Sequence, residues 1–150
     1  MSPMRWIAAG FGTGFAPVAA GTVASAAAAL VGAALLWWSP AALAAAAMLA
    51  TAAGFWAIHA GGIDGDPGWV VIDEFAGQWI SMLGLAAVTP GGVAAAFVLF
   101  RFFDVTKLGP VGWADRRHGA FGVMADDVIA GILTAAILWG ARWCWSRAWH

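Results

Sequence analysis

The chain has 150 residues, of which 63% are hydrophobic and only 10% are charged. Soluble domains usually carry about a quarter charged residues, so this composition argues against a soluble fold and favours a small polytopic membrane protein that forms one domain over residues 1–150. The formal net charge of −1 provides no basic patch, which excludes nucleic acid as an expected partner. The single cysteine, Cys144, excludes an internal disulfide framework.

The acidic residues are confined to the middle of the chain. All eight lie between positions 64 and 127, and both long apolar runs that precede them carry no charge. The eight are Asp64, Asp66, Asp73, Glu74, Asp104, Asp115, Asp126 and Asp127. This confinement is the first indication of a functional site.

In chain order, residues 1–15 begin with one basic residue and an apolar stretch. A cleaved signal peptide is one interpretation, but glycines and Pro17 interrupt the apolar stretch, and we instead expect a short interfacial or re-entrant helix. The glycine-rich loop GFGTGFAPVAAGTVAS follows at residues 10–25. Its glycines are compatible both with an anion cradle of backbone N–H groups and with close helix packing, and the sequence leaves the two open.

Two apolar helices are expected next, at residues 22–38 and 41–60, with a turn at Ser39-Pro40 between them. The second has about 20 residues without charge, which is roughly what a hydrocarbon core of about 30 Å requires. The polar loop at residues 61–68 then returns the chain to the side where it began.

Three further helices complete the expected bundle, which we class as all-α with about five long helices. They cover residues 69–88, 93–108 and 128–145, and they are joined by a turn at 89–92 and a loop at 109–123. Indole rings favour the headgroup level of a membrane, and the far face of the bundle is expected to carry Trp37, Trp38, Trp139, Trp143 and Trp145.

The alternation of these helices places the acids at one face of the membrane. Asp73 and Glu74 fall in the first turns of the third helix. Asp126 and Asp127 are expected to open the fifth helix, and Asp104 falls near the end of the fourth. Five basic residues are assigned to this face and two to the opposite face, so by the positive-inside rule the acids face the cytoplasm.

Adjacent carboxylates in an apolar segment are costly because they repel each other and lose hydration. The helix dipole favours an acid in a first turn by about 0.3–1 kcal/mol, which explains one acid at each helix start. It does not explain two adjacent acids at two starts together with Asp104. Several carboxylates that converge at one depth are the ligands of a hard divalent cation such as Mg²⁺, and we predict a metal site here.

Two glycines indicate how the acids come together. Gly77 and Gly131 follow Asp73 and Asp127 by four residues, so each glycine shares a helix face with its acid. Small residues let helices approach closely in membrane bundles. We therefore predict that the third and fifth helices cross at these glycines.

The basic residues near the acids have two open roles. Arg101 and Lys107 lie three residues before and after Asp104, on the same helix face. They are either salt-bridge partners of Asp104 or ligands of a substrate phosphate beside the metal. Arg116 lies in the following loop and is equally compatible with anionic lipid headgroups and with substrate.

Four segments carry a resemblance to a known family: GFGTGFAPVAAGTVAS, DPGWVVIDEFAGQWI, FRFFDVTKLGPVGWADRRHG and FGVMADDVIAG. In order and spacing they resemble the bacterial phosphatidylglycerophosphatase A family over most of the chain. The resemblance implies an Mg²⁺-dependent enzyme of the bacterial inner membrane. Such an enzyme removes the terminal phosphate of phosphatidylglycerophosphate to give phosphatidylglycerol in phospholipid biosynthesis.

The resemblance also assigns roles by position. The family's acids fall on Asp66, Asp73, Glu74, Asp104, Asp126 and Asp127, its basic positions on Arg101 and Lys107, and its loop residues on Gly21, Thr22 and Ser25. The chain departs from the family where Ala20 and Ala24 replace a usual proline and glycine, and where Leu108-Gly109 replaces Pro-Trp. These changes spare the acids and bear on the phosphate-contact role of the loop.

The resulting hypothesis is metal-assisted hydrolysis of a phosphomonoester by an activated water, with a covalent aspartyl-phosphate left open. The catalytic acids are Asp73, Glu74, Asp126 and Asp127. The ligands of one or two Mg²⁺ ions are Asp73, Glu74, Asp104 and Asp127, with Asp66 and Asp126 as outer ligands or the base. The phosphate ligands are Arg101, Lys107, Thr22, Ser25 and Arg116.

The expected partners are the membrane and the lipid substrate, and a homo-oligomer is left open. The alternative from another class is a small ion- or solute-transport protein, because buried carboxylates near a basic residue also mark ion paths. That alternative predicts acids spread through the depth of the membrane.

Overall fold

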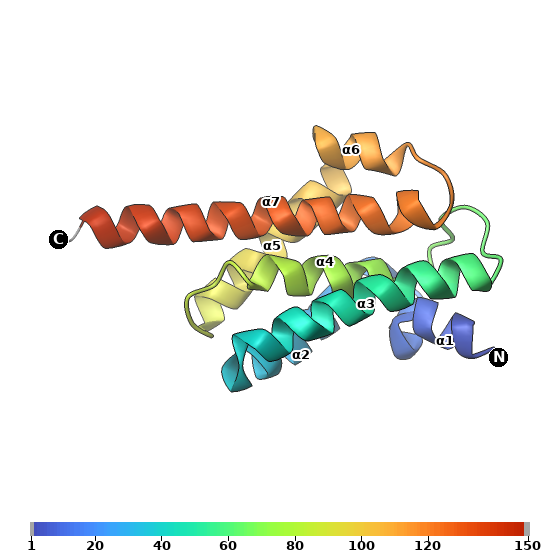
Figure 1. The fold of residues 1–150 in the computed structure, drawn as a ribbon, viewed down its shortest axis with the longest axis horizontal. Helices are drawn as coiled ribbons and strands as arrows, with labels where there is room; N and C mark the ends of the chain where they lie inside the picture. The colour runs from blue at the N-terminus through green and yellow to red at the C-terminus, as the bar shows by residue number, and fades with distance from the viewer. Residues whose placement is uncertain (1, 149–150) are drawn as a thin grey trace.

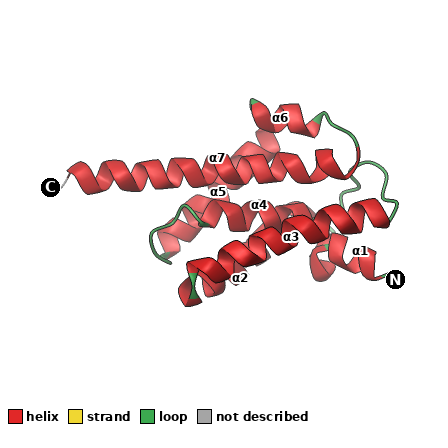
Figure 2. Cartoon of the chain, viewed as in Figure 1, coloured by secondary structure: helices red, strands yellow, loops and turns green. Residues whose placement is uncertain are grey.

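The computed structural model describes residues 2–148, and within that range it contains helices, turns and loops but no strand (Figure 2). The all-α prediction is confirmed. In chain order the elements are α1 (Pro3–Ala8), the 3-10 segment η1 (Gly10–Phe15), α2 (Ala20–Trp38), α3 (Pro40–Ala60), α4 (Ile72–Met82), α5 (Pro90–Thr106), α6 (Pro110–Asp115) and α7 (Gly119–Ala148).

The short helix α4 lies at the centre of the bundle, packed against α2, α3 and α7 (Figure 1). Nine of its 11 residues are buried. The apolar side chains that α4 buries are accompanied by four polar ones, those of Asp73, Glu74, Gln78 and Ser81. The position of α4 therefore takes two carboxylates into the interior of the protein.

The prediction of a helix over residues 69–88 is wrong in length, because α4 covers only Ile72–Met82. Before it, the N–H of Val71 donates to the carbonyl of Ala8 over 2.8 Å, which holds the incoming chain against α1. After it, Gly84 turns so close to α7 that a Cβ would lie 2.4 Å from the carbonyl oxygen of Ala135. Eleven residues span about 16 Å, roughly half of a hydrocarbon core, so α4 is enclosed by the other helices and does not span.

The last helix begins earlier than the sequence suggests. The loop expected at residues 109–123 contains α6 and the first turn of α7, which starts at Gly119. Asp126 and Asp127 consequently lie about two turns inside α7 and not at its start. The helix dipole, which acts on the first turn, therefore does not account for this pair.

The glycine-rich loop serves close packing. Gly14 lies so near the chain before α4 that a Cβ would be 2.0 Å from the carbonyl oxygen of Trp69. Gly10 has a φ of +53° and lies against Phe75, where a Cβ would be 2.8 Å from the ring. Of the two interpretations left open by the sequence, these contacts support packing.

The predicted crossing of α4 and α7 is confirmed. A Cβ on Gly131 would lie 2.5 Å from the carbonyl oxygen of Gly77, and a Cβ on Gly77 would lie 2.6 Å from the carbonyl oxygen of Asp127. Only glycine permits this approach of the two backbones. The acids of both helices are thereby brought to the same region.

Three of the described helices, α2, α3 and α7, are long and apolar enough to cross a membrane. Trp37 and Trp38, at the end of α2, are both 80% exposed, and Trp139 and Trp143 on α7 are exposed as well. The last turns of α7 extend beyond the other helices, at the left of Figure 1. Exposed apolar and indole side chains on such helices indicate membrane association.

Candidate active site

Glu74 is held by two other helices. Ser25 Oγ on α2 lies 2.6 Å from Glu74 Oε2, and Arg101 Nη1 on α5 lies 2.7 and 2.6 Å from the two carboxylate oxygens. Gly21 makes room for this carboxylate, because a Cβ there would lie 2.2 Å from Glu74 Oε1. Charge-assisted hydrogen bonds of this kind fix both partners, so α2, α4 and α5 are joined at one point.

Asp104 links this cluster to α7. It accepts a short hydrogen bond from Arg101 Nη1 and another of 2.8 Å from Lys107 Nζ. The same ammonium lies 2.6 Å from Asp126 Oδ2 on α7 and 3.6 Å from Asp115 Oδ1 at the end of α6. Arg101 and Lys107 are therefore salt-bridge partners of Asp104, which was one of the two roles expected for them.

Asp73 and Asp127 lack a basic partner among the described residues. Asp73 Oδ1 accepts a hydrogen bond of 3.0 Å from the N–H of Glu74, and in the same way Asp126 accepts one of 2.9 Å from the N–H of Asp127. Both Asp73 and Asp127 are buried, at 7% and 2% exposure. Buried carboxylates without a counter-charge are expensive, so this pair favours a bound cation.

These residues surround one pocket of about 240 Å³. Two basic side chains, Arg101 and Lys107, line it together with six carboxylates. The carboxylates belong to Asp66, Asp73, Glu74, Asp104, Asp126 and Asp127. Since two bases cannot neutralise six acids, the pocket carries an excess of negative charge. We call it the acid pocket.

A divalent cation fits the acid pocket. Asp104, Asp126 and Asp127 are buried, and each offers a carboxylate oxygen within 4.8 Å of the others. Carboxylate oxygens are the ligands that Mg²⁺ prefers, with water and substrate phosphate completing its shell. Asp126, expected as an outer ligand, thus belongs to the most compact group, whereas Glu74, expected as a ligand, is engaged by Arg101.

The charges around the pocket shift the pKa values of two groups outside the spanning helices. Burial alone lowers the pKa of the Lys107 ammonium, but hydrogen bonds with Asp104 and Asp126 outweigh it and raise the pKa above its usual value. Loss of hydration raises the pKa of Asp66 against the attraction of Lys107. Lys107 therefore stays protonated at neutral pH, where its positive charge offsets part of the acid excess.

All eight acids of the chain line either the acid pocket or a second pocket that adjoins it. The two pockets share Asp66 and Asp126. The expectation that the acids gather at one end of the bundle therefore agrees with the structure. A path of acids through the depth of the membrane, as the transport alternative predicts, is not observed among the described residues.

Three of the predicted phosphate ligands, Thr22, Ser25 and Arg116, do not line the acid pocket. Thr22 is exposed in the first turn of α2, where Gly21 and not Thr22 lines the pocket. Arg116 is exposed at the end of α6 and is also absent from the lining. Ser25 reaches the site through Glu74. The phosphate-binding roles of Thr22, Ser25 and Arg116 stay predictions.

Gln78 is a residue to which sequence reasoning assigned no role. It is completely buried in α4, one turn after Glu74, and its amide nitrogen and oxygen have no hydrogen-bond partner among the described residues. Buried amides are nearly always paired, so an unpaired one calls for a ligand, a water or a functional explanation. In the sequence, Gln78 was indicated by its polar side chain in an apolar segment and by its place in the segment DPGWVVIDEFAGQWI, which carries the family resemblance.

The chain matches one protein-family model and several known proteins. Residues 6–142 match the family model described as Phosphatidylglycerophosphatase A. The chain is 36% identical to phosphatidylglycerophosphatase A of Escherichia coli strain K12, over 95% of this chain and 86% of the relative. It is 35% identical to the Haemophilus influenzae protein of the same name, over 52% of this chain and 48% of the relative.

A further relative carries a different name. The chain is 39% identical to a protein of Bacteroides thetaiotaomicron named "Putative phosphatidylinositol-3-phosphatase", over 91% of this chain and 92% of the relative. No solved structure matches the chain. Both names describe the removal of a phosphate from a phospholipid headgroup.

Proposed function

The chain belongs to the phosphatidylglycerophosphatase A family, and from this membership we propose that it hydrolyses phosphatidylglycerophosphate with water to phosphatidylglycerol and inorganic phosphate. It is a phosphoric monoester hydrolase. The observation that carries the proposal is the acid pocket, in which six carboxylates and two basic side chains meet at one end of an apolar helical bundle. Such a constellation suits a metal ion and the phosphate that it activates.

The metal is proposed to be Mg²⁺, held by Asp104, Asp126 and Asp127. Their oxygens are hard ligands within reach of a single ion. When bound, Mg²⁺ supplies Lewis-acid polarisation of the phosphate and neutralises part of its charge. Asp66 lines the same pocket and is available as an outer ligand.

Arg101 is proposed to bind the substrate phosphate. All of its hydrogen bonds to the described residues are made through Nη1, to Glu74, Asp104 and Ser25. Nε and Nη2 therefore stay available as donors in a pocket that Arg101 lines. A guanidinium already fixed by two carboxylates binds a phosphate without further ordering of its side chain, which favours both affinity and orientation.

Asp73 is proposed as the general base. Its Oδ1 accepts the N–H of Glu74, and Oδ2 makes no hydrogen bond within the described residues. A buried carboxylate with one open oxygen, facing the same pocket as the phosphate ligands, is suited to take a proton from the attacking water. Glu74 then acts by holding Arg101 in place.

The site is proposed to face the cytoplasm from the bacterial inner membrane, where the product enters phospholipid biosynthesis. The basic residues near the acids outnumber those at the other end of the bundle, as the positive-inside rule requires of a cytoplasmic face. A diacyl lipid in that leaflet keeps its tails in the bilayer while its headgroup reaches the pocket. The exposed apolar side chains of α2 and α7 provide the surface for those tails.

The test is phosphate release by the purified protein in mixed micelles. We expect release from phosphatidylglycerophosphate in Mg²⁺ that exceeds release from phosphatidylinositol 3-phosphate at equal surface concentration. Release from the inositol lipid alone would assign the chain the activity named for its Bacteroides relative. Release from neither lipid would refute the proposed function.

A further inference from the structure

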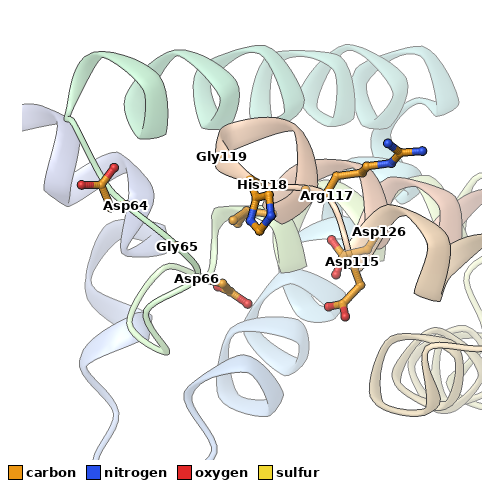
Figure 3. A pocket seen from close by; sticks show the side chains of 10 residues that line it. Asp64, Gly65, Asp66, Asp115, Arg117, His118, Gly119 and Asp126 are labelled. Carbon is orange, nitrogen blue, oxygen red and sulfur yellow. The ribbon is translucent and has the colours of Figure 1, made fainter.

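A second pocket of about 320 Å³ adjoins the acid pocket (Figure 3). The loop between α3 and α4 supplies Asp64 and Asp66 to one side of it. Asp115, the last residue of α6, and His118, in the connection from α6 to α7, supply the other side. Asp126, which lines both pockets, comes from α7. The shared residues Asp66 and Asp126 make the two pockets direct neighbours.

His118 is an exposed residue that lines this second pocket. In Figure 3 its imidazole lies between Asp66 on one side and Asp115 with Asp126 on the other. No hydrogen bond or ion pair ties the ring to another described residue. The guanidinium of Arg117, by contrast, stacks 4.5 Å from the ring centre of Trp113 and points away from Asp66.

The residues that line the second pocket limit the class of ligand that it can bind. Its volume corresponds to about ten water molecules at roughly 30 Å³ each, which is more than a single ion needs. The four carboxylates disfavour an acyl chain and a free anion, and the guanidinium in the lining, that of Arg117, is stacked on Trp113. Hydroxyl groups suit the walls best, because carboxylates accept their hydrogen bonds and an imidazole can donate or accept one.

We propose that the second pocket binds the polyol segment of the lipid headgroup, which is the group that carries the phosphate to be removed. The inference rests on the proposed function, since it places the phosphomonoester in the acid pocket. The polyol carbon bonded to that phosphate must then lie within one bond of the ester oxygen, and the adjoining pocket is where the rest of the polyol fits. His118 and Asp115 are its specificity-determining residues.

The proposal explains how one scaffold can serve different headgroups. The names of the relatives describe substrates in which the phosphate is carried by glycerol or by inositol. Both are polyols, and they differ in size and in the number of hydroxyl groups. A pocket that is separate from the metal and phosphate ligands allows the polyol to change without change in the reaction.

The test measures binding and does not require turnover. The probes are two phosphonates that cannot be hydrolysed: 3,4-dihydroxybutyl phosphonate, which mimics glycerol phosphate, and methylphosphonate, which lacks the polyol. Their dissociation constants are measured by calorimetry on the full-length protein in detergent with Mg²⁺. The variants are His118→Leu and Asp115→Asn, and the control is His59→Leu, which changes an exposed histidine at the end of α3 that does not line the pocket.

The wild type and His59→Leu should bind the dihydroxy probe about tenfold more tightly than methylphosphonate, as expected for one or two hydroxyl hydrogen bonds. His118→Leu should bind the two probes with about equal affinity. In Asp115→Asn the preference for the dihydroxy probe should be smaller than in the wild type. Methylphosphonate binding reports that each variant is folded. Equal affinity of the wild type for both probes, or a full preference in His118→Leu, would overturn the proposal.

Failure of the proposed function is detected separately. If the protein prefers the dihydroxy probe but releases no phosphate from either phospholipid, the polyol pocket is supported and the proposed activity is refuted. If the protein releases phosphate but binds the two probes equally, the proposed activity is supported and the polyol pocket is refuted.

Discussion

Gly77 and Gly131 lie against each other where α4 crosses α7, so closely that a Cβ on Gly131 would also lie 3.1 Å from both Gly77 Cα and Ile80 Cβ. Each glycine follows an acid by four residues, and the crossing therefore sets Asp73 and Asp127 into the same pocket. Helix packing and the position of the acids are coupled through this contact.

We expect Gly131→Ala to lower both stability and activity. The added methyl meets backbone atoms of α4, and overpacking of this kind typically costs about 1–3 kcal/mol. Gly140→Ala is the matched control in the same helix, because a Cβ there meets nothing within 4 Å. Thermal unfolding in detergent should show a fall for Gly131→Ala and none for Gly140→Ala. Equal unfolding temperatures for the two variants would contradict a tight crossing.

The glycines of the crossing could be predicted from the sequence because the helix face that each acid shares with its glycine depends on local spacing. Asp73 and Gly77 share a helix face whatever surrounds them, and the same holds for Asp127 and Gly131. The start of α7 could not be predicted in this way. The acids at 126–127 resemble a helix start, but no proline interrupts the seven residues before them, and Gly119 begins the helix instead.

The partners of the acids depend on tertiary packing and could not be predicted from spacing. Ser25 and Glu74 are 49 positions apart and meet only because α2 packs against α4. The choice between Gly21 and Thr22 as the pocket-lining residue depends on the rotation of α2 about its axis. The weak amphipathic pattern of an almost uniformly apolar helix does not reveal that rotation.

Ser25→Ala should leave the carboxylate of Glu74 less firmly positioned, because it removes a hydrogen bond to that group. It removes a hydroxyl 2.6 Å from Glu74 Oε2, and hydrogen bonds to charged groups contribute about 1.5–3 kcal/mol. We expect a drop in the rate of phosphate release of about tenfold, because Glu74 positions Arg101. Thr51→Ala is the control, since it loses a hydroxyl that bonds only to a helix carbonyl of α3. Equal rates for these two variants would argue against a role of Ser25.

Lys107→Met should destabilise the protein in the absence of metal. Asp126 loses its only basic partner among the described residues, and Asp104 keeps Arg101 alone. Breaking a fully buried pair costs about 3–5 kcal/mol, but the Lys107 side chain is 30% exposed, so we expect about 1–3 kcal/mol after screening. Excess Mg²⁺ should recover part of the loss by replacing the missing charge.

The control for this variant is Arg142→Met, in which the altered charge is exposed near the other end of α7. It should show neither the loss of stability nor the recovery by Mg²⁺. Chemical unfolding with and without Mg²⁺ measures both. If Lys107→Met were as stable as wild type without metal, the ammonium would not be balancing the acids.

Gln78→Leu should separate stability from activity. An unpaired buried amide costs about 1–3 kcal/mol, so an apolar side chain of similar size should raise the free energy of unfolding. If the amide serves the reaction, phosphate release falls at the same time. Thr134→Val is the control, because its buried hydroxyl is likewise unpaired among the described residues. A loss of stability in Gln78→Leu would mean that the amide is paired in the folded protein.

The most direct test of a metal-dependent phosphatase is phosphate release from phosphatidylglycerophosphate at increasing Mg²⁺ by the wild type and by Asp127→Asn. Asp127 offers one of the three clustered oxygens and has no basic partner among the described residues. We expect wild-type activity to vanish in EDTA and return with Mg²⁺. Asp127→Asn should stay folded and lose at least about 100-fold in rate, since a bound metal contributes several kcal/mol. Full activity in EDTA, or in Asp127→Asn, would contradict the assignment.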